Sequence, residues 1–135
     1  DINNLNNIYN DKYEYINYIK ANKIYNINDL KNKYSYLYER YKNRLQDVYI
    51  KSKEFNSKII FITQIKFDGL RDDKLFLLNE ITKEFSKERG IKIIKLDEKF
   101  AGEINDFYDQ NHPTEMGSEK ISDIIYTELI KIFDD

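Results

Sequence analysis

The chain has 135 residues, of which 41% are hydrophobic and 34% charged, and this composition predicts one globular domain, or part of one, rather than a disordered chain. Its formal net charge of −2 provides neither the basic surface that nucleic acids bind nor a polybasic membrane surface, so we expect no nucleic-acid partner. The absence of cysteine excludes disulfides and thiolate zinc sites, and no apolar run approaches the roughly 18 residues that span a bilayer, so we expect no transmembrane segment.

The first part of the sequence predicts a helix after an irregular start. Residues 1–28 are rich in asparagine, which favours turns and caps over helix interiors, so we expect an irregular or short-helical lead-in. Asn28 and Asp29 are residue types that begin helices. Leucine and tyrosine side chains then recur at helical spacing, which predicts one long helix from about residue 29 to about residue 55.

The second part alternates short strands with helices. Residues 59–62 form a β-branched apolar run that predicts a strand buried on both faces. Thr63 and Gln64 follow at its carboxyl end, where open α/β sheets bind ligands, although the capping of a strand end explains them as well. The next predictions are a helix led by Asp72 and Asp73 and ended by Gly90, and a second strand over residues 91–96. A loop over residues 97–108 with a helical turn near Phe100 follows, and then a final helix capped by Thr114.

This alternation predicts the fold class. Strands that alternate with helices of this length form βαβ units in a parallel sheet. Two strands that are apolar on both faces need neighbours on both sides. We therefore expect an α/β fold in which the N-terminal strands of the sheet are missing, so that residues 1–135 are the C-terminal part of a larger domain.

The most informative segment for function is the turn at residues 109–113. His112 is the only histidine in the chain, Asp109 precedes it by three residues, and Pro113 follows it. An imidazole carries protons near neutral pH. A carboxylate that accepts its Nδ1–H fixes the tautomer and stabilises the imidazolium. Proline pushes the residue before it away from helical geometry, so the turn can hold Asp109 against His112.

Three interpretations of this turn remain open. The first is a surface histidine beside an aspartate that shapes the turn. The second is a metal site in which Asp106, Asp109, His112 and Glu115 converge, although the chain offers no second histidine and no cysteine. The third is an acid–base pair for nucleophilic catalysis.

The wider sequence favours the third interpretation. Residues 107–117, FYDQNHPTEMG, resemble the C-terminal block of the SGNH (GDSL-type) hydrolases, which has the pattern Asp-x-x-His, often followed by Pro, with a Gly a few residues into the last helix. Residues 59–64, IIFITQ, resemble the fourth strand of that family, and the long helix before them is similar to the family's helix at that position. The resemblance covers roughly residues 29–132.

The resemblance implies a flavodoxin-like three-layer α/β/α fold with a parallel sheet. It also implies ester hydrolysis by a Ser-His-Asp mechanism that uses no cofactor and no metal. His112 would be the general base and then the general acid, and Asp109 would orient it. The implied substrate is a small-molecule, carbohydrate or lipid ester.

The sequence departs from the family in one decisive respect. The family's nucleophilic serine lies in a Gly-Asp-Ser motif after the first strand, and this chain contains no such motif. Its serines lie in predicted helices and loops and are Ser35, Ser52, Ser57, Ser86, Ser118 and Ser122. The sequence therefore predicts a fragment of a serine esterase that holds the base and its orienting carboxylate but neither nucleophile nor oxyanion hole. The alternative is a non-catalytic α/β binding or interaction module.

Overall fold

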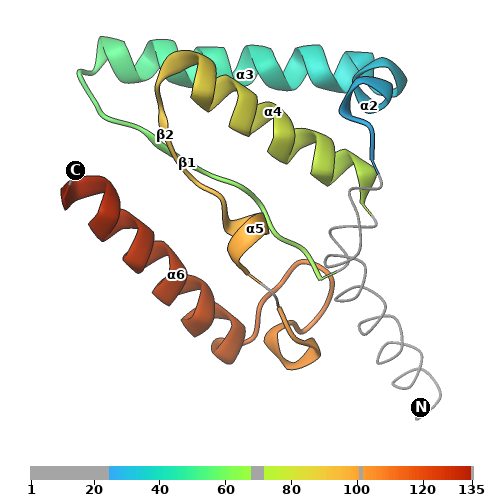
Figure 1. Ribbon diagram of the computed structural model, residues 1–135, viewed down its shortest axis with the longest axis vertical. Coiled ribbons are helices and arrows are strands. Elements are labelled where there is room, and N and C mark those ends of the chain that lie inside the picture. The colour runs from blue at the N-terminus through green and yellow to red at the C-terminus, as the bar shows by residue number, and fades with distance from the viewer. Residues whose placement is uncertain (1–24, 68–71, 101, 135) are drawn as a thin grey trace.

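The computed structural model describes residues 25–67, 72–100 and 102–134. Most of the lead-in predicted for residues 1–28 lies outside these ranges. Figure 1 shows helices arranged around a small sheet. In chain order the elements are α2 (Ile27–Lys33), α3 (Ser35–Glu54), β1 (Ile60–Ile62), α4 (Asp73–Arg89), β2 (Lys92–Ile94), the short α5 (Leu96–Lys99), the 3-10 helix η1 (Ile104–Asp106) and α6 (Glu115–Asp134).

The predicted long helix is present as two helices. The side chain of Asn26 accepts hydrogen bonds from the backbone N–H groups of Asn28 and Asp29, so the first helix begins before the predicted start. Tyr34 separates α2 from α3 with a backbone (φ −118°, ψ 40°) that is not helical. Its hydroxyl donates to Asp73 Oδ2 over 2.9 Å. The prediction of one uninterrupted helix was therefore wrong at Tyr34.

Helix α4 confirms the predicted caps at both of its ends. The Oδ1 atom of Asp72 accepts a hydrogen bond from the Leu75 N–H over 3.0 Å, which satisfies one of the N–H groups left free in a first turn. Gly90 ends the helix in the left-handed conformation with φ +64°, and its N–H donates to the Ser86 carbonyl. A left-handed residue at this position is the reason why glycine is favoured there.

The two predicted strands form a parallel pair. Ile60 lies opposite Lys92, Phe61 opposite Ile93 and Ile62 opposite Ile94. The second strand is shorter than predicted, because Leu96 already begins α5. The residues of β1 are half-buried, and Lys92 in β2 is exposed. The strands are therefore not buried on both faces as predicted.

The predicted fold class was wrong. Helices dominate the described residues, and their sheet contains only β1 and β2, so the fold is not a flavodoxin-like three-layer α/β/α structure. A strand–helix–strand order is compatible with a sheet of any width, and the prediction of a wide sheet relied on strands beyond the two in this sequence. In addition, β1 is only partly buried, and in β2 only Ile94 is fully buried.

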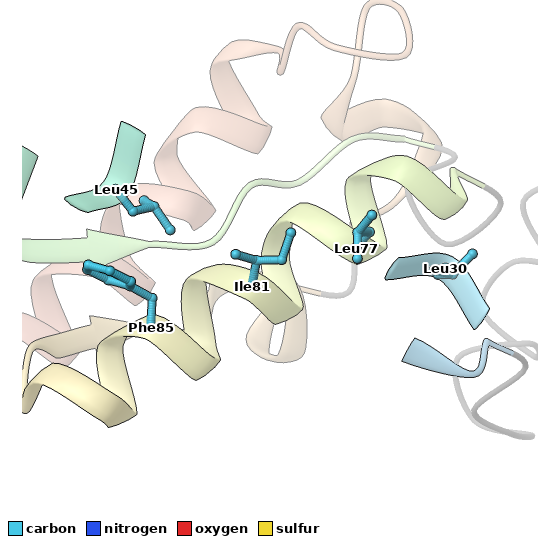
Figure 2. Packing of buried hydrophobic residues seen from close by; sticks show 5 residues of the cluster. All are labelled: Leu30, Leu45, Leu77, Ile81 and Phe85. Carbon is cyan, nitrogen blue, oxygen red and sulfur yellow. The ribbon is translucent and has the colours of Figure 1, made fainter. Parts of the chain in front are cut away.

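The main hydrophobic cluster lies between helices rather than on the sheet. Figure 2 shows Leu77, Ile81 and Phe85 from α4 beside Leu30 of α2 and Leu45 of α3. The sheet joins this cluster through Phe61, whose ring meets that of Phe85 edge-on with centroids 6.3 Å apart. Helix α6 is not part of this cluster and contacts β2, α5 and η1 instead. Within the described ranges, no helix combines the length and apolar character that crossing a membrane requires.

Candidate functional site

The turn at residues 109–113 is held by backbone hydrogen bonds on both sides. Phe107 and Pro113 form an antiparallel bridge, and the Tyr108 N–H donates to the His112 carbonyl over 2.8 Å. The Phe67 N–H donates to the Gln110 carbonyl, also over 2.8 Å. Because Phe67 lies on the segment that leaves β1, the last bond attaches the turn to the carboxyl-terminal side of the sheet.

Asp109 shapes the turn with its own side chain. Its Oδ1 atom accepts hydrogen bonds from the Asn111 N–H over 2.7 Å and from the His112 N–H over 2.9 Å. An aspartate that bonds to the backbone N–H groups following it forms a stable local turn. This backbone contact fixes the position of the carboxylate independently of the imidazole.

The same carboxylate contacts the imidazole. The Nδ1 atom of His112 lies 2.8 Å from Asp109 Oδ2 and 3.0 Å from Oδ1. The Asn111 N–H, the His112 ring and the His112 N–H lower the pKa of Asp109 from 3.8 to about 2. Because an ionised carboxylate only accepts hydrogen bonds, it favours the tautomer with the proton on Nδ1. That tautomer leaves a lone pair on Nε2 with which the ring can accept a proton.

The candidate pair is open to solvent. The side chain of His112 is 74% exposed and that of Asp109 is 57% exposed. None of the hydrogen bonds among the described residues uses Nε2 of His112. A substrate or another protein segment can therefore reach this nitrogen without displacing a contact.

The end of the turn is held in place at the start of α6 by Thr114, the predicted cap of that helix. Thr114 Oγ1 accepts a hydrogen bond from the Gly117 N–H over 3.2 Å and donates to the Asn105 carbonyl over 2.7 Å. The Thr114 N–H donates to the Asp106 carbonyl over 2.8 Å. Thr114 therefore joins the first turn of α6 to η1, and this confirms its predicted role as a cap.

Asp106 has a supporting role that sequence reasoning missed. Its side chain is fully buried, accepts a hydrogen bond from the Glu103 N–H, and lies 2.8 Å from Lys120 Nζ on α6. The hydrogen bond to Asp106 raises the pKa of Lys120. The two residues are 14 positions apart, so no local pattern signals their contact.

The four residues of the alternative metal site do not come together. Asp106 is committed to Lys120, whereas Asp109 faces His112. Within the part of the chain that the structure describes, no group of three or more His, Cys, Asp or Glu side chains is placed to hold a metal ion. The described geometry therefore gives no support to the metal interpretation of this turn.

Gly117 is required for the close approach of α6 to η1. A Cβ atom on Gly117 would overlap the backbone carbonyl of Asp106. Alanine normally stabilises a helix interior by about 1 kcal/mol relative to glycine, but relief of this overlap requires a backbone shift. We expect Gly117→Ala to lower the free energy of unfolding by about 2 kcal/mol in urea titrations.

Ser118→Ala is the matched control for this variant, because it adds no group to the contact with η1 and replaces an exposed side chain on the same helical turn. It is expected to change stability by less than about 0.5 kcal/mol. A Gly117→Ala variant that is as stable as the wild type or more stable would contradict the close-packing argument.

Thr63 and Gln64 have structural partners at the end of β1. Thr63 Oγ1 donates to Asp97 Oδ1 over 2.6 Å. The backbone N–H and carbonyl of Gln64 are both bonded by the side-chain amide of Asn79, over 2.9 and 2.8 Å. Capping of the strand end therefore accounts for both residues.

A nearby cavity between Asn79 and Phe107 has a volume of about 30 Å³, which is enough for water but not for an ester substrate.

No serine of the chain is positioned as a nucleophile. All six serines lie in the described residues. Ser52 and Ser57 donate to the carbonyls of Tyr49 and Phe55, and Ser86 is buried in α4. The other three, Ser35, Ser118 and Ser122, are exposed on α3 and α6. None of the six hydrogen-bonds His112, so the described site consists of a base and its carboxylate.

Comparisons with protein-family models, with curated proteins and with solved structures found no match to this chain.

Proposed function

We propose that this chain supplies the general base and the orienting carboxylate of a serine-dependent acyl ester hydrolase. The observation that carries the proposal is the 2.8 Å contact between His112 Nδ1 and Asp109 Oδ2, in a turn that also fixes the carboxylate through two backbone N–H groups. The proposal depends on this site and on the sequence resemblance of residues 107–117, and not on the fold class.

The geometry suits a defined sequence of proton transfers. Nε2 of His112 takes the proton of a serine hydroxyl as the serine oxygen attacks the ester carbonyl. The resulting imidazolium is stabilised by Asp109 and then donates the proton to the departing alcohol. Water releases the acyl group in a second round of the same transfers. The substrate class is a small-molecule, carbohydrate or lipid ester, and no step requires a cofactor or metal.

The nucleophile in this proposal is a serine outside the 135 residues. The six serines of the chain do not contact His112, whereas the exposed imidazole can receive a hydroxyl from another segment. The donors that stabilise the oxyanion are likewise expected outside this chain, since they belong near the nucleophile.

A second candidate is a non-catalytic binding or interaction module. The observation that favours it is the same lack of contact between His112 and any of the six serines. In that case the Asp109–His112 contact has only the structural role of closing the turn.

A covalent labelling experiment separates the two candidates. The longest natural polypeptide that contains this chain is treated with a fluorophosphonate probe, and its hydrolysis of p-nitrophenyl acetate is measured. The esterase proposal expects hydrolysis together with labelling of one serine outside the six named above, which mass spectrometry locates. Neither labelling nor hydrolysis would favour the binding module, and a label on one of the six would refute an external nucleophile.

A further inference from the structure

A second concave surface lies at the amino-terminal end of the sheet, away from the His112 turn. It has a volume of about 390 Å³ and is formed by the C-terminal ends of α3, α4 and α6 and the starts of β1 and β2. Figure 1 shows the C-terminal end of α6 on the side where α3 leads into β1. Ile60, Ile132 and Phe133 contribute apolar surface to it. We call this surface the amino-end groove.

The charged side chains that the described residues contribute to the amino-end groove are basic. Lys53, Lys58, Arg89 and Lys92 line it, and no aspartate or glutamate of the described ranges does. Lys53, Lys58 and Arg89 have no carboxylate partner among the described residues. Lysines elsewhere, such as Lys31 with Glu84, do form ion pairs. The groove therefore concentrates positive charge on a chain whose net charge is −2.

Arg89 is held in place at this groove by neutral groups. Its NH2 atom donates to Gln46 Oε1 over 2.8 Å. Its guanidinium carbon lies 5.6 Å from the ring centroids of both Tyr49 and Phe85, within the range of a cation–π contact. These contacts hold the guanidinium beside the two rings and use one of its five N–H donors, so donors remain for an anion.

Lys53 adds a second positive charge to the same aromatic ring. Its Nζ atom lies 5.3 Å from the centroid of Tyr49, which Arg89 also contacts. Two cations that share one ring repel each other when no anion lies between them. A bound carboxylate would reduce this repulsion and accept the remaining guanidinium hydrogen bonds.

We propose that the amino-end groove binds a small carboxylate with an apolar body, such as a medium-chain acyl carboxylate. The carboxylate contacts Arg89 and Lys53, and the apolar body lies along Ile60, Ile132 and Phe133. The volume falls in the usual range for small-molecule sites. The side chain of Phe133 is 70% exposed, so an apolar ligand that covers it removes surface from water. This site is separate from the proposed hydrolase site.

Calorimetric titration with octanoate tests the proposal on the full chain. Octan-1-ol and octylamine serve as neutral and cationic probes with the same apolar body. We expect octanoate to bind at least about tenfold more tightly than octanol, and octylamine to bind most weakly. Lys53→Gln/Arg89→Gln should raise the Kd for octanoate by at least about tenfold, because it removes both charge-assisted contacts.

Lys42→Gln/Lys74→Gln is the matched control. Both lysines lie over tyrosine rings without lining the groove, so the variant removes the same charge and should leave the Kd within about twofold. Lys58→Gln provides a second test that does not disturb the packing of Arg89 and should raise the Kd about threefold. Equal binding of octanoate and octanol, no binding of octanoate, or unchanged affinity in the groove variants would overturn the proposal.

Discussion

Replacement of His112 by alanine is expected to lower kcat for ester hydrolysis by at least about 10⁴-fold in the polypeptide that contains this chain. Without the imidazole, no group in the turn accepts the serine proton efficiently, because the remaining carboxylate of Asp109 is a much weaker base than an imidazole. The departing alcohol also loses its proton donor. The measurement is the steady-state hydrolysis of p-nitrophenyl acetate by purified wild-type and variant protein at neutral pH.

The fold should survive this substitution. The His112 side chain is 74% exposed, so its removal leaves no buried cavity, and we expect the free energy of unfolding to change by less than about 1 kcal/mol. Added imidazole should restore part of the activity, since the exposed position lets a free ring approach. Near-normal turnover by a correctly folded His112→Ala protein would refute the proposed function.

The parts of the fold that follow from local chemistry were predictable. Asp72 and Gly90 bound α4 because a side-chain acceptor and a left-handed residue act within one helical turn. The break at Tyr34 has no such local signal. The Tyr34 hydroxyl contacts Asp73, which lies 39 residues away. The periodicity of the surrounding side chains continues through the break, and this is why the sequence predicts a single helix.

The width of the sheet was not predictable in the same way. The sequence correctly indicates that residues 60–62 and 92–94 pair in parallel. The number of further strands depends on how much of each strand face the helices cover, and a single sequence does not encode that quantity locally. Here Leu77 and Ile81 of α4 are almost completely buried, whereas every residue of β1 is only partly buried. Helix packing therefore provides burial that the prediction assigned to a wider sheet.

The candidate site also combines a contact that local chemistry predicts with contacts that depend on long-range packing. The contact between Asp109 and His112 spans three positions and follows from turn chemistry. The contact of Asp106 with Lys120, and the need for glycine at position 117, follow from the approach of α6 to η1. Sequence reasoning thus identified the pair that we propose to be catalytic, but not the ion pair of the buried Asp106 with Lys120 that joins α6 to η1.

Asp109→Asn is expected to lower kcat by about 10² to 10⁴-fold while leaving the turn intact. The Asn111 and His112 N–H groups bond to Oδ1 of Asp109 in the wild type, and an asparagine would keep its oxygen in that position to satisfy them. Its amide nitrogen would then occupy the place of Oδ2, which lies 2.8 Å from His112 Nδ1. Because this nitrogen only donates, it would stabilise the tautomer with the proton on Nε2, which cannot accept a proton from serine.

The lowered pKa of Asp109 sets the pH range over which its ionised carboxylate acts on the imidazole. The pKa of Asp109 is lowered to about 2. Its ionised form therefore contributes fully above about pH 4, and this contribution is lost only as the pH falls through about 2. The carboxylate consequently stays ionised from about pH 5 to pH 8, and its own titration adds no pH dependence to the ratio of wild-type to Asp109→Asn activity in that range.

Asp123→Asn replaces an exposed aspartate on α6, outside the turn. This variant should leave activity unchanged, and it controls for the loss of one surface charge. If Asp109→Asn acted only by loosening the turn, the free energy of unfolding would fall together with kcat. If it acts on the tautomer, kcat falls while that free energy stays within about 0.5 kcal/mol of the wild type. Retention of full activity by Asp109→Asn would show that the carboxylate shapes the turn without serving the imidazole in catalysis.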